Sequence, residues 1–479
     1  MKKRSLQSLA PALLLAVSLM FTVLGCGKNF YFAGRVLPPS AITNRVLIAV
    51  QNPSSFTTGT LVFVDAFYDI RHSFNNPNNS FSIAGYAGSE PVTIQNMPEE
   101  QTGAVYGSGD GSYSTVNYAK ENAGTTLLPA KSPLSSSIFL SRDQRYALAA
   151  NQASHQFTVF DRVLGQTFPL SVPGIYRVSL NAGGTLALGF VQNSDAVYSV
   201  VRLTQQQTVD LSGGPSTWAS YPGLKNIQDC EPQNLPQYCA VQVAPTSTMF
   251  NRPIKAVFSS DGNSIFVLNC GPECGGSQAG IVTIPITAGS FNGNASGPAG
   301  SNLAPSSVLP IPGGSTDAIQ SGNTFYVSGQ QVQPDGLFGG NLTVVDLPSN
   351  AITATYSISD GTHTKMLFGD DNSLWIGSQR CLAGEKYAHN QAGASQPFGC
   401  LTLFNTATNA VTIDPYKGDL TGVTSVEGLH KIYVAEGGQV HIYNSADFTE
   451  RDNTNVAITD TAYDAAYMDA TSDADNANN

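Results

Sequence analysis

Short apolar runs separated by turn signals recur along the chain, and the stretch from Pro253 to Thr287 is the clearest example. Its apolar runs are Ile254–Ser259, Ser264–Asn269 and Gly280–Ile286. Ser260-Asp261-Gly262-Asn263 separates the first two runs, and Asp-Gly at the centre of such a segment is a hairpin signal. The pattern predicts antiparallel β-strands joined by tight turns.

This unit of four strands repeats with variations, which is the signature of a repeat architecture. Complete units can be traced from Ser136 to Thr459, and in two of them the fourth strand is expected at Thr208–Leu211 and at Asn455–Thr459. A weaker unit precedes them, and its expected strands are Val92–Asn96, Ala104–Gly107, Ser112–Tyr118 and Thr125–Leu128.

The first unit lacks an inner strand, whereas the chain has a spare strand at its other end. Arg45–Gln51, Thr60–Phe67 and Ser80–Gly85 make an incomplete unit, and Ala462–Asp469 follows a complete last unit. A ring in which the C-terminal strand joins the N-terminal blade accounts for both observations. We therefore predict an all-β protein, a β-propeller of four-stranded blades formed by residues 42–470 as a single domain. The count gives eight blades, or seven if the weak unit is not a blade.

The units resemble the YVTN-type propeller repeat, in which an Asp-Gly turn precedes an apolar strand and a later strand ends in an Asp-Thr-x-Thr-Asn-like turn. The resemblance covers most of Ser132–Tyr443 in degraded form, and its best matches are Ser260–Val267, Val344–Asn350 and Leu403–Asn409. It implies a propeller but no single function, because the repeat occurs in surface proteins, binding modules and propeller enzymes.

The N-terminus has the order of segments typical of a bacterial lipoprotein signal peptide. Lys2-Lys3-Arg4 is basic, and Leu9–Leu24 is an apolar run that is short for a membrane-spanning helix. Val23-Leu24-Gly25-Cys26 resembles a lipobox, which implies that residues 1–25 are removed and that Cys26 carries the lipid. The alternative is an ordinary secretory leader followed by an incidental cysteine.

The residues around the propeller indicate where the mature protein resides. Gly27 follows the cysteine at the position where Asp would indicate inner-membrane retention, so the lipoprotein resemblance implies the outer membrane. Residues 26–41 would be the lipidated cysteine and a tether, and residues 471–479 a disordered acidic tail.

A formal net charge of −11 without a basic patch argues against nucleic acid as a partner.

The cysteines predict disulfide bonds. If Cys26 carries lipid, six of the seven cysteines remain, and an even number in an exported chain implies disulfides, for which 15 pairings exist. We expect Cys230–Cys239, Cys270–Cys274 and Cys381–Cys400, because each bond would close one loop. Zinc at Cys270 and Cys274 is the rival interpretation, but no nearby Cys or His completes a tetrahedral set. No metal or other cofactor is predicted.

The long insertions gather on one face of the predicted ring. Because adjacent strands are antiparallel, the loop between the second and third strands opens on the same face as the connection to the next blade. We call this the loop face, and every cysteine couple is expected there, whereas the opposite face has mostly tight turns, with the long loop Thr287–Ser306 as the exception. Function concentrates in loops on a rigid scaffold, and pinning a loop reduces the entropy lost on binding. The alternative to a binding role is that the disulfides only protect the exposed loops from proteolysis.

Aromatic and charged side chains of these insertions are the candidate binding residues. They are Phe56, Trp218, Tyr221, Tyr238, Phe338, Arg380, Lys386, Tyr387, His389 and Phe398.

Catalytic motifs are missing from the sequence. The six histidines are scattered, and no zincin, c-type haem, serine-hydrolase or phosphate-loop motif is present. His155, His363 and His389 would lie on the loop face. A propeller lactonase or another propeller hydrolase would need acidic residues and histidines around the central opening, where Asp317, Asp360 and His363 are the available candidates.

These features favour a lipid-anchored, extracytoplasmic β-propeller that binds an envelope protein or a glycan through its loop face. A propeller enzyme with its site at the central opening is one alternative. An assembly factor similar to the eight-bladed propeller lipoprotein of outer-membrane protein insertion is another. That family's Trp-containing, PQQ-type repeat is missing, because the chain contains only Trp218 and Trp375.

Overall fold

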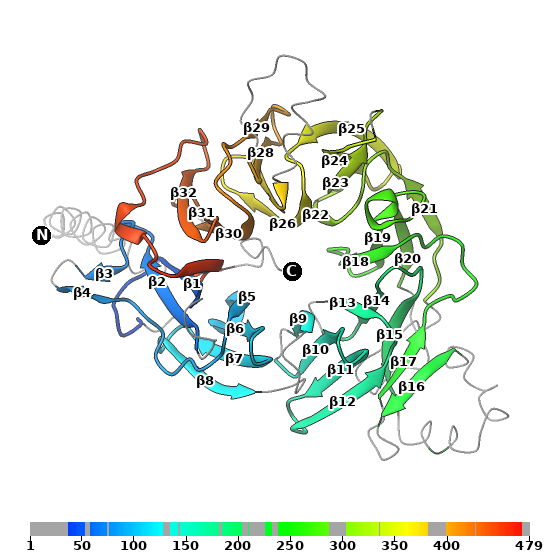
Figure 1. Cartoon of the computed structure of the whole chain (residues 1–479), viewed down its shortest axis with the longest axis horizontal. Coiled ribbons are helices and arrows are strands. Elements are labelled where there is room, and N and C mark those ends of the chain that lie inside the picture. Colours follow the sequence, from blue (N-terminus) through cyan, green and yellow to red (C-terminus); the bar gives the residue numbers. More distant parts are fainter. Residues whose placement is uncertain are drawn as a thin grey trace, which may run out of the picture.

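The computed structural model describes residues 37–52, 58–73, 76–127, 135–141, 144–181, 184–203, 209, 226–231, 238–286, 303–334, 336–381, 399–426 and 428–471. They form a ring of eight antiparallel blades, which confirms the predicted eight-bladed propeller (Figure 1). The expected leader and lipobox, most of the tether and most of the acidic tail lie outside these residues. Within the described residues, no helix has the length and apolar character needed to cross a membrane.

The first four blades follow the order of the chain except at the closure and at the outer edge of blade 4, where β17 precedes β16. From the centre outward, the strands of blade 1 are β33 (Thr461–Tyr467), β1 (Arg45–Gln51) and β2 (Thr60–Asp65). Blade 2 contains β5 (Pro91–Met97), β6 (Thr102–Gly107), β7 (Ser112–Asn117) and β8 (Asn122–Leu127). Blade 3 contains β9 (Ser135–Leu140), β10 (Tyr146–Asn151), β11 (Gln156–Asp161) and β12 (Gln166–Ser171). Blade 4 contains β13 (Ile175–Leu180), β14 (Ala187–Val191), β15 (Val197–Arg202), β17 (Tyr238–Gln242) and β16 (Ile227–Glu231).

The other four blades complete the ring. Blade 5 contains β18 (Pro253–Phe258), β19 (Ser264–Asn269), β20 (Gly280–Pro285) and β21 (Ser307–Pro310). Blade 6 contains β22 (Asp317–Ser321), β23 (Thr324–Val332), β24 (Phe338–Asp346) and β25 (Ala351–Ile358). Blade 7 contains β26 (Thr362–Gly369), β27 (Ser373–Gln379), β28 (Leu401–Asn405) and β29 (Val411–Ile413). Blade 8 contains β30 (Leu420–Val426), β31 (Lys431–Glu436) and β32 (Gln439–Asn444). The small pair β3 (His72–Ser73) and β4 (Asn76–Ser80) and the 3₁₀ turns η1 (Pro98–Glu100), η4 (Gly271–Cys274) and η6 (Thr454–Val456) lie between strands.

Three of the expected outer strands are wrong. The fourth strand of blade 4 is β17 rather than Thr208–Leu211, and β16 pairs with β17 as a fifth, outermost strand. In blade 8, the expected strand Asn455–Thr459 is replaced by an isolated bridge between Tyr443 and Glu450 and by η6. In blade 1, Ser80 ends β4, and the rest of Ser80–Gly85 contributes only two isolated bridges, Ser82 to Val62 and Ala84 to Asn122 of blade 2. Outer strands have one unpaired edge and carry weak sequence patterns, which explains these errors.

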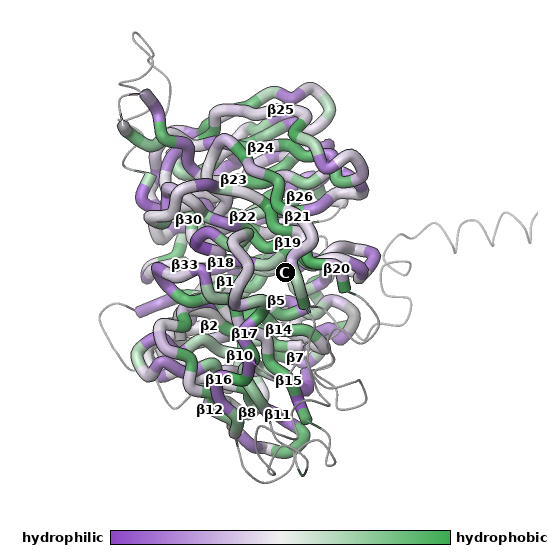
Figure 2. The backbone as a smooth tube through the Cα atoms, turned by 90° about the vertical axis from the view of Figure 1, so that its right-hand side faces the viewer, coloured by the Kyte–Doolittle hydropathy of each residue, from purple (hydrophilic) through white to green (hydrophobic). Residues whose placement is uncertain are grey.

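The cores lie between blades, and the second strand of each blade contributes to two of them. In β19, Ile265 and Val267 pack toward blade 4, whereas Phe266 and Leu268 pack toward blade 6. A strand buried on both faces is therefore a continuous apolar run rather than an alternating one. Each of the eight seams contains such a cluster. Figure 2 shows hydrophobic residues recurring along the strands in a side view of the ring.

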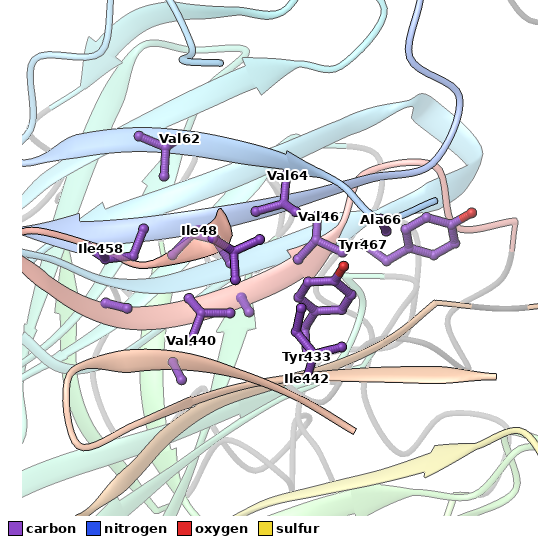
Figure 3. Packing of buried hydrophobic residues seen from close by; sticks show 14 of the residues in the cluster. Val46, Ile48, Val62, Val64, Ala66, Tyr433, Val440, Ile442, Ile458 and Tyr467 are labelled. Carbon is purple, nitrogen blue, oxygen red and sulfur yellow. The ribbon is translucent and has the colours of Figure 1, made fainter. Parts of the chain in front are cut away.

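The closure between blades 8 and 1 has its own hydrophobic cluster, in which Val46, Ile48 and Tyr467 face Tyr433 and Ile442 (Figure 3). The C-terminal strand β33 pairs antiparallel with β1, as predicted. The ring is therefore closed by hydrogen bonds between the first and last strands as well as by apolar burial.

A buried ion pair secures the same closure. Arg45 at the start of β1 binds Asp469, which follows β33, through two donors, with Nη2 2.6 Å from Oδ1 and Nε 3.0 Å from Oδ2. Its Nη1 binds Glu121 Oε1 at 2.9 Å and the carbonyl oxygen of Tyr118 at 2.8 Å, both on blade 2. Arg45 is 2% exposed, so these charges compensate one another away from water.

Candidate functional site

Two disulfides restrain the loop face. Cys270–Cys274 encloses η4 immediately after β19, and Cys381–Cys400 joins the segments that flank the connection from β27 to β28. Both connections run from the second to the third strand of a blade, so they open on the same side of the ring. All three disulfides form with the expected partners.

The third disulfide is not on the loop face, which corrects the prediction. Cys230 and Cys239 lie opposite each other on β16 and β17. Cys239 also pairs with Val201, near the end of β15, and this end of the strand points toward the face with tight turns. The expected position is wrong because the fourth strand of blade 4 was placed too early, which assigned these cysteines to a connection between blades.

The expected binding residues are only partly covered by the structure. Tyr238 is not a loop residue, because it is buried in β17 and its hydroxyl donates to Asp161 Oδ2 at 2.9 Å. Phe338 begins β24 and is half-buried, and Arg380 is exposed beside Cys381. The others lie outside the described residues, namely Phe56, Trp218, Tyr221, Lys386, Tyr387, His389 and Phe398.

The disulfide ring of blade 5 is docked on blade 6. Glu273, inside the Cys270–Cys274 ring, accepts hydrogen bonds from Gln330 N at 2.9 Å and from Gln330 Nε2 at 3.1 Å. Gln330 Oε1 in turn accepts from Gly361 N, on the connection to blade 7, at 3.2 Å. Burial raises the pKa of the Glu273 carboxyl. The chain from Gln330 to Val332 is the last part of β23 and supplies this docking surface.

A polar pocket of about 380 Å³ opens on the loop face beside this ring. One wall is the connection between β14 and β15, and the other is the connection from blade 4 to blade 5. The residues that line it are Asn193, Ser194, Asp195, Ala196, Gln242, Val243, Ala244, Pro245, Ser247, Phe250 and Arg252.

The two walls hold each other in place. Arg252 N donates to Asp195 Oδ1 at 2.8 Å, and the Arg252 guanidinium donates to the carbonyl oxygen of Asn193. The Asp195 side chain is 56% exposed and that of Arg252 is 29% exposed. A carboxylate and a guanidinium thus border the pocket with fixed positions and remain accessible to a ligand.

The second wall is attached to the Cys270–Cys274 ring. Cys270 N donates to the Arg252 carbonyl oxygen at 3.0 Å, and Ser277 N donates to Asn251 Oδ1 at 2.9 Å. The Asn251 amide also donates to Ser277 Oγ at 2.7 Å. The disulfide therefore stiffens the segment that carries Arg252.

The pocket also contains strained backbone. Asn193, Ala244 and Arg252 have φ of 54°, 41° and 54°. Residues with a Cβ rarely adopt this left-handed region, and each such conformation costs on the order of 1 kcal/mol, least for Asn. Strain of this kind persists where surrounding contacts impose it, and it gathers at binding and catalytic sites.

The inner strands surround the central opening with charged residues that are paired. Lys255 Nζ on β18 donates to Asp317 Oδ1 on β22, and Lys365 Nζ on β26 lies 3.2 Å from Asp464 Oδ1 on β33. Asp464 Oδ2 accepts from Ile94 N on β5 at 2.8 Å. These pairs link inner strands of different blades, so a structural role accounts for them.

Two of the three catalytic candidates, His363 and Asp317, are close enough for the charge of Asp317 to act on the His363 ring. His363 is fully buried, and its Nε2 donates to the Ser359 carbonyl oxygen at 2.9 Å. Burial lowers the pKa of His363 to about 4, so the ring is neutral at pH 7 and its Nδ1 is an acceptor. Neither Nδ1 nor Asp317 Oδ2 has a hydrogen-bond partner among the described residues. The third candidate, Asp360, is buried and accepts from Gly340 N at 2.8 Å.

The residues that shape the pocket and its support are not among the candidates predicted from the sequence, above all Asp195, Arg252, Glu273 and Gln330. Glu273 could have been identified because it lies inside the short Cys-x3-Cys ring. Asp195 and Arg252 are ordinary loop residues in the sequence, and only the fold brings them together. Across the described ranges, no group of three or more His, Cys, Asp or Glu side chains is placed to hold a metal ion.

Comparisons with known proteins support the fold. No protein-family model and no curated protein sequence matches the chain. Among solved structures, it is similar to dihydro-heme d1 dehydrogenase NirN in complex with DHE, with 9% identity and a TM-score of 0.53, over 89% of this chain and 75% of that one. It is also similar to Kuenenia stuttgartiensis hydrazine synthase, with 12% identity and a TM-score of 0.48, over 77% and 99%. The β-propeller domain of Myceliophteria thermophila Cps50 (Swd1) matches at 10% identity and a TM-score of 0.45, over 74% and 97%. The first of these similarities supports the fold, and an identity of 9% carries no information about function.

Proposed function

We propose that the protein is a binding module that takes up its ligand, an envelope protein or a glycan, in the loop-face pocket between blades 4 and 5. The observation that carries the proposal is the bracing of the pocket wall by the Cys270–Cys274 ring, through the Cys270–Arg252 and Ser277–Asn251 hydrogen bonds. A preorganised wall loses little conformational entropy when a ligand binds. Asp195 and Arg252 supply an acceptor and donors for that ligand.

The test compares two disulfides on opposite faces. We expect Cys270→Ala/Cys274→Ala to weaken binding to solubilised envelope proteins or arrayed glycans at least tenfold, because the Arg252 wall loses its support. Cys230→Ala/Cys239→Ala should retain binding, because that disulfide lies near the opposite face. Surface plasmon resonance measures both variants, and thermal unfolding shows that each is folded. Equal binding by the two variants would contradict the proposal.

A second variant tests the pocket itself without touching a disulfide. Asp195→Ala removes a largely exposed carboxylate and the single hydrogen bond that it accepts from Arg252 N, so it should lower the unfolding temperature only slightly and abolish binding of the same envelope protein or glycan. Retained binding would place the ligand elsewhere on the molecule.

We propose further that the protein is a bacterial lipoprotein whose propeller, built from degenerate YVTN-type repeats, is exported and lipid-anchored. The lipobox-like Val23–Cys26 and the three disulfides support this proposal, because disulfides persist in oxidising compartments. Metabolic labelling with an alkyne fatty acid should mark the wild-type protein in the membrane fraction. Cys26→Ser should remove the label, whereas Cys230→Ser should retain it. A labelled Cys26→Ser protein would refute the anchor.

Catalysis at the central opening is a second candidate function, and it is favoured by two acceptors that have no hydrogen-bond partner among the described residues, Asp317 Oδ2 and His363 Nδ1. A water molecule held between a neutral imidazole and a carboxylate could be activated for hydrolysis. An assay of lactone hydrolysis, in which the released protons are measured, tests this possibility. Turnover that is lost in His363→Asn and retained in Asp195→Ala would support the enzyme, whereas no turnover by the wild-type protein would reject it for this substrate class.

A further inference from the structure

A second pocket lies at the seam where the ring closes, between blade 8 and blade 1. It has a volume of about 420 Å³ and is lined by Tyr68, Asp69, Arg451, Asp452 and Asn455. Tyr68 and Asp69 belong to the turn that follows β2, the third strand of blade 1. The pocket is therefore on the side of the tight turns, away from the pocket beside Cys270–Cys274.

An exposed ring of the pocket lining, that of Tyr68, packs against a second exposed ring, that of the neighbouring Phe67. Phe67 and Tyr68 are 58% and 59% exposed, and their rings meet edge to face with centroids 4.9 Å apart. Tyr416 is the only other strongly exposed aromatic residue among those that the structure describes. Adjacent exposed aromatic rings are costly to hydrate and commonly mark recognition surfaces.

The floor of the pocket is rigid. Lys431 Nζ donates to both carboxylate oxygens of Asp69 at 2.8 Å, and the Tyr433 hydroxyl donates to Asp69 Oδ1 at 2.5 Å. It adopts a left-handed conformation with φ of 56°. These contacts join blade 1 to blade 8 and fix the turn that presents the two rings.

The rim offers hydrogen-bond donors and acceptors of several kinds. Arg451 Nε lies 3.3 Å from Asp69 Oδ2, which orients a guanidinium whose side chain is 43% exposed. Asp452 accepts from Thr454 N at 2.9 Å through one oxygen, and Asn455 is exposed beside it. A guanidinium donates hydrogen bonds, a carboxylate accepts them and a carboxamide does both, so together these groups can pair with hydroxyl groups in either direction.

We propose that this pocket is a saccharide-binding site that takes a pyranose ring of a neutral glycan. The C–H face of a pyranose matches the exposed ring surface of Phe67 and Tyr68, and its hydroxyls match the mixed rim of Arg451, Asp452 and Asn455. The floor is preorganised, so little entropy is lost on binding. This site is independent of the loop-face pocket and does not rest on the function proposed above.

The experiment is a glycan-array screen of the purified full-length protein, followed by calorimetric titration of the best pyranose-containing oligosaccharide. Tyr68→Ala and Asn455→Ala should each raise the dissociation constant at least tenfold, and both changes are at exposed positions that the fold tolerates. Tyr416→Ala removes a comparably exposed ring, 46% exposed, from the connection between blades 7 and 8 and should have no effect. The oligosaccharide should also raise the unfolding temperature, because the pocket bridges the closure.

Three outcomes would overturn the inference. They are an array without any bound glycan, binding that survives both Tyr68→Ala and Asn455→Ala, and binding that only Asp195→Ala abolishes. The last result would place the glycan in the loop-face pocket and would leave the binding function itself intact.

Discussion

Replacing Arg45 with methionine should lower the free energy of unfolding by about 3–5 kcal/mol, because the carboxylates of Asp469 and Glu121 would remain buried without their shared cation. Both acceptors are less than 10% exposed. The destabilisation should appear as a lower midpoint in urea unfolding. In this variant we expect the weakened closure to open before the other seams, so β33 should lose hydrogen-exchange protection before the other strands.

Two controls separate this effect from a simple change in charge. Lys120→Met removes the same charge from an exposed position of blade 2 and should change stability by less than about 0.5 kcal/mol. Arg45→Met combined with Asp469→Leu and Glu121→Leu should recover much of the loss, because no unpaired charge remains buried. A loss below about 1 kcal/mol for Arg45→Met alone would mean that strand pairing and apolar burial are sufficient for closure.

Replacing Glu436 with glutamine should stabilise the protein at neutral and alkaline pH. Glu436 ends β31 and is fully buried, and neither carboxyl oxygen has a partner among the described residues. The nearest cation, Lys417, is already bound to Asp414 and to the Tyr443 hydroxyl. Burial, together with the charges of Asp414 and Glu450, raises the pKa of Glu436 to about 8.

The sign of the pH effect follows from that raised pKa. Between the unfolded value of 4.5 and about 8, the folded protein keeps a proton that the unfolded chain has released. Stability therefore falls as pH rises through this window, by about 1.4 kcal/mol per unit, and levels off above it. In Glu436→Gln this slope should disappear, so the variant and the wild type should differ most at pH 8 and least near pH 4.5.

Urea unfolding from pH 4 to 9 measures the two curves. Glu100→Gln changes an exposed carboxylate and should follow the wild type throughout. Parallel curves for Glu436→Gln and the wild type would show that Glu436 does not carry a proton in the folded state at neutral pH.

The fold was predictable wherever strands are buried on both faces. The apolar run Ser264–Asn269 and the turn at Asp261-Gly262 specify β18 and β19, and Gly262 has a φ of 71°, as such a turn requires. The unpaired first unit and the spare strand Ala462–Asp469 predicted the closure, which β33 and β1 confirm. The outer strands were harder to locate because they have one neighbour and a half-exposed face, so Tyr238–Gln242 could not be distinguished from a connecting segment.

The candidate site was much less predictable. The short spacing of Cys270 and Cys274 identified a restrained loop, and the structure confirms that disulfide. Asp195 and Arg252 lie far apart in the sequence. No local sequence pattern predicts which loop residues of adjacent blades will contact each other. Likewise, Asp69 and Arg451 meet only because the two ends of the chain meet.

The pairing of the first strand with the last also has a consequence for synthesis. Arg45 and Asp469 are 424 residues apart, so the ribosome must produce almost the entire chain before the first blade can be completed. Until then, β1 presents an unpaired inner edge, which invites misassembly and proteolysis. The final strand thus acts as a check on completeness, because a product that is truncated before residue 461 cannot hide that edge and would be recognised by quality control as unfinished.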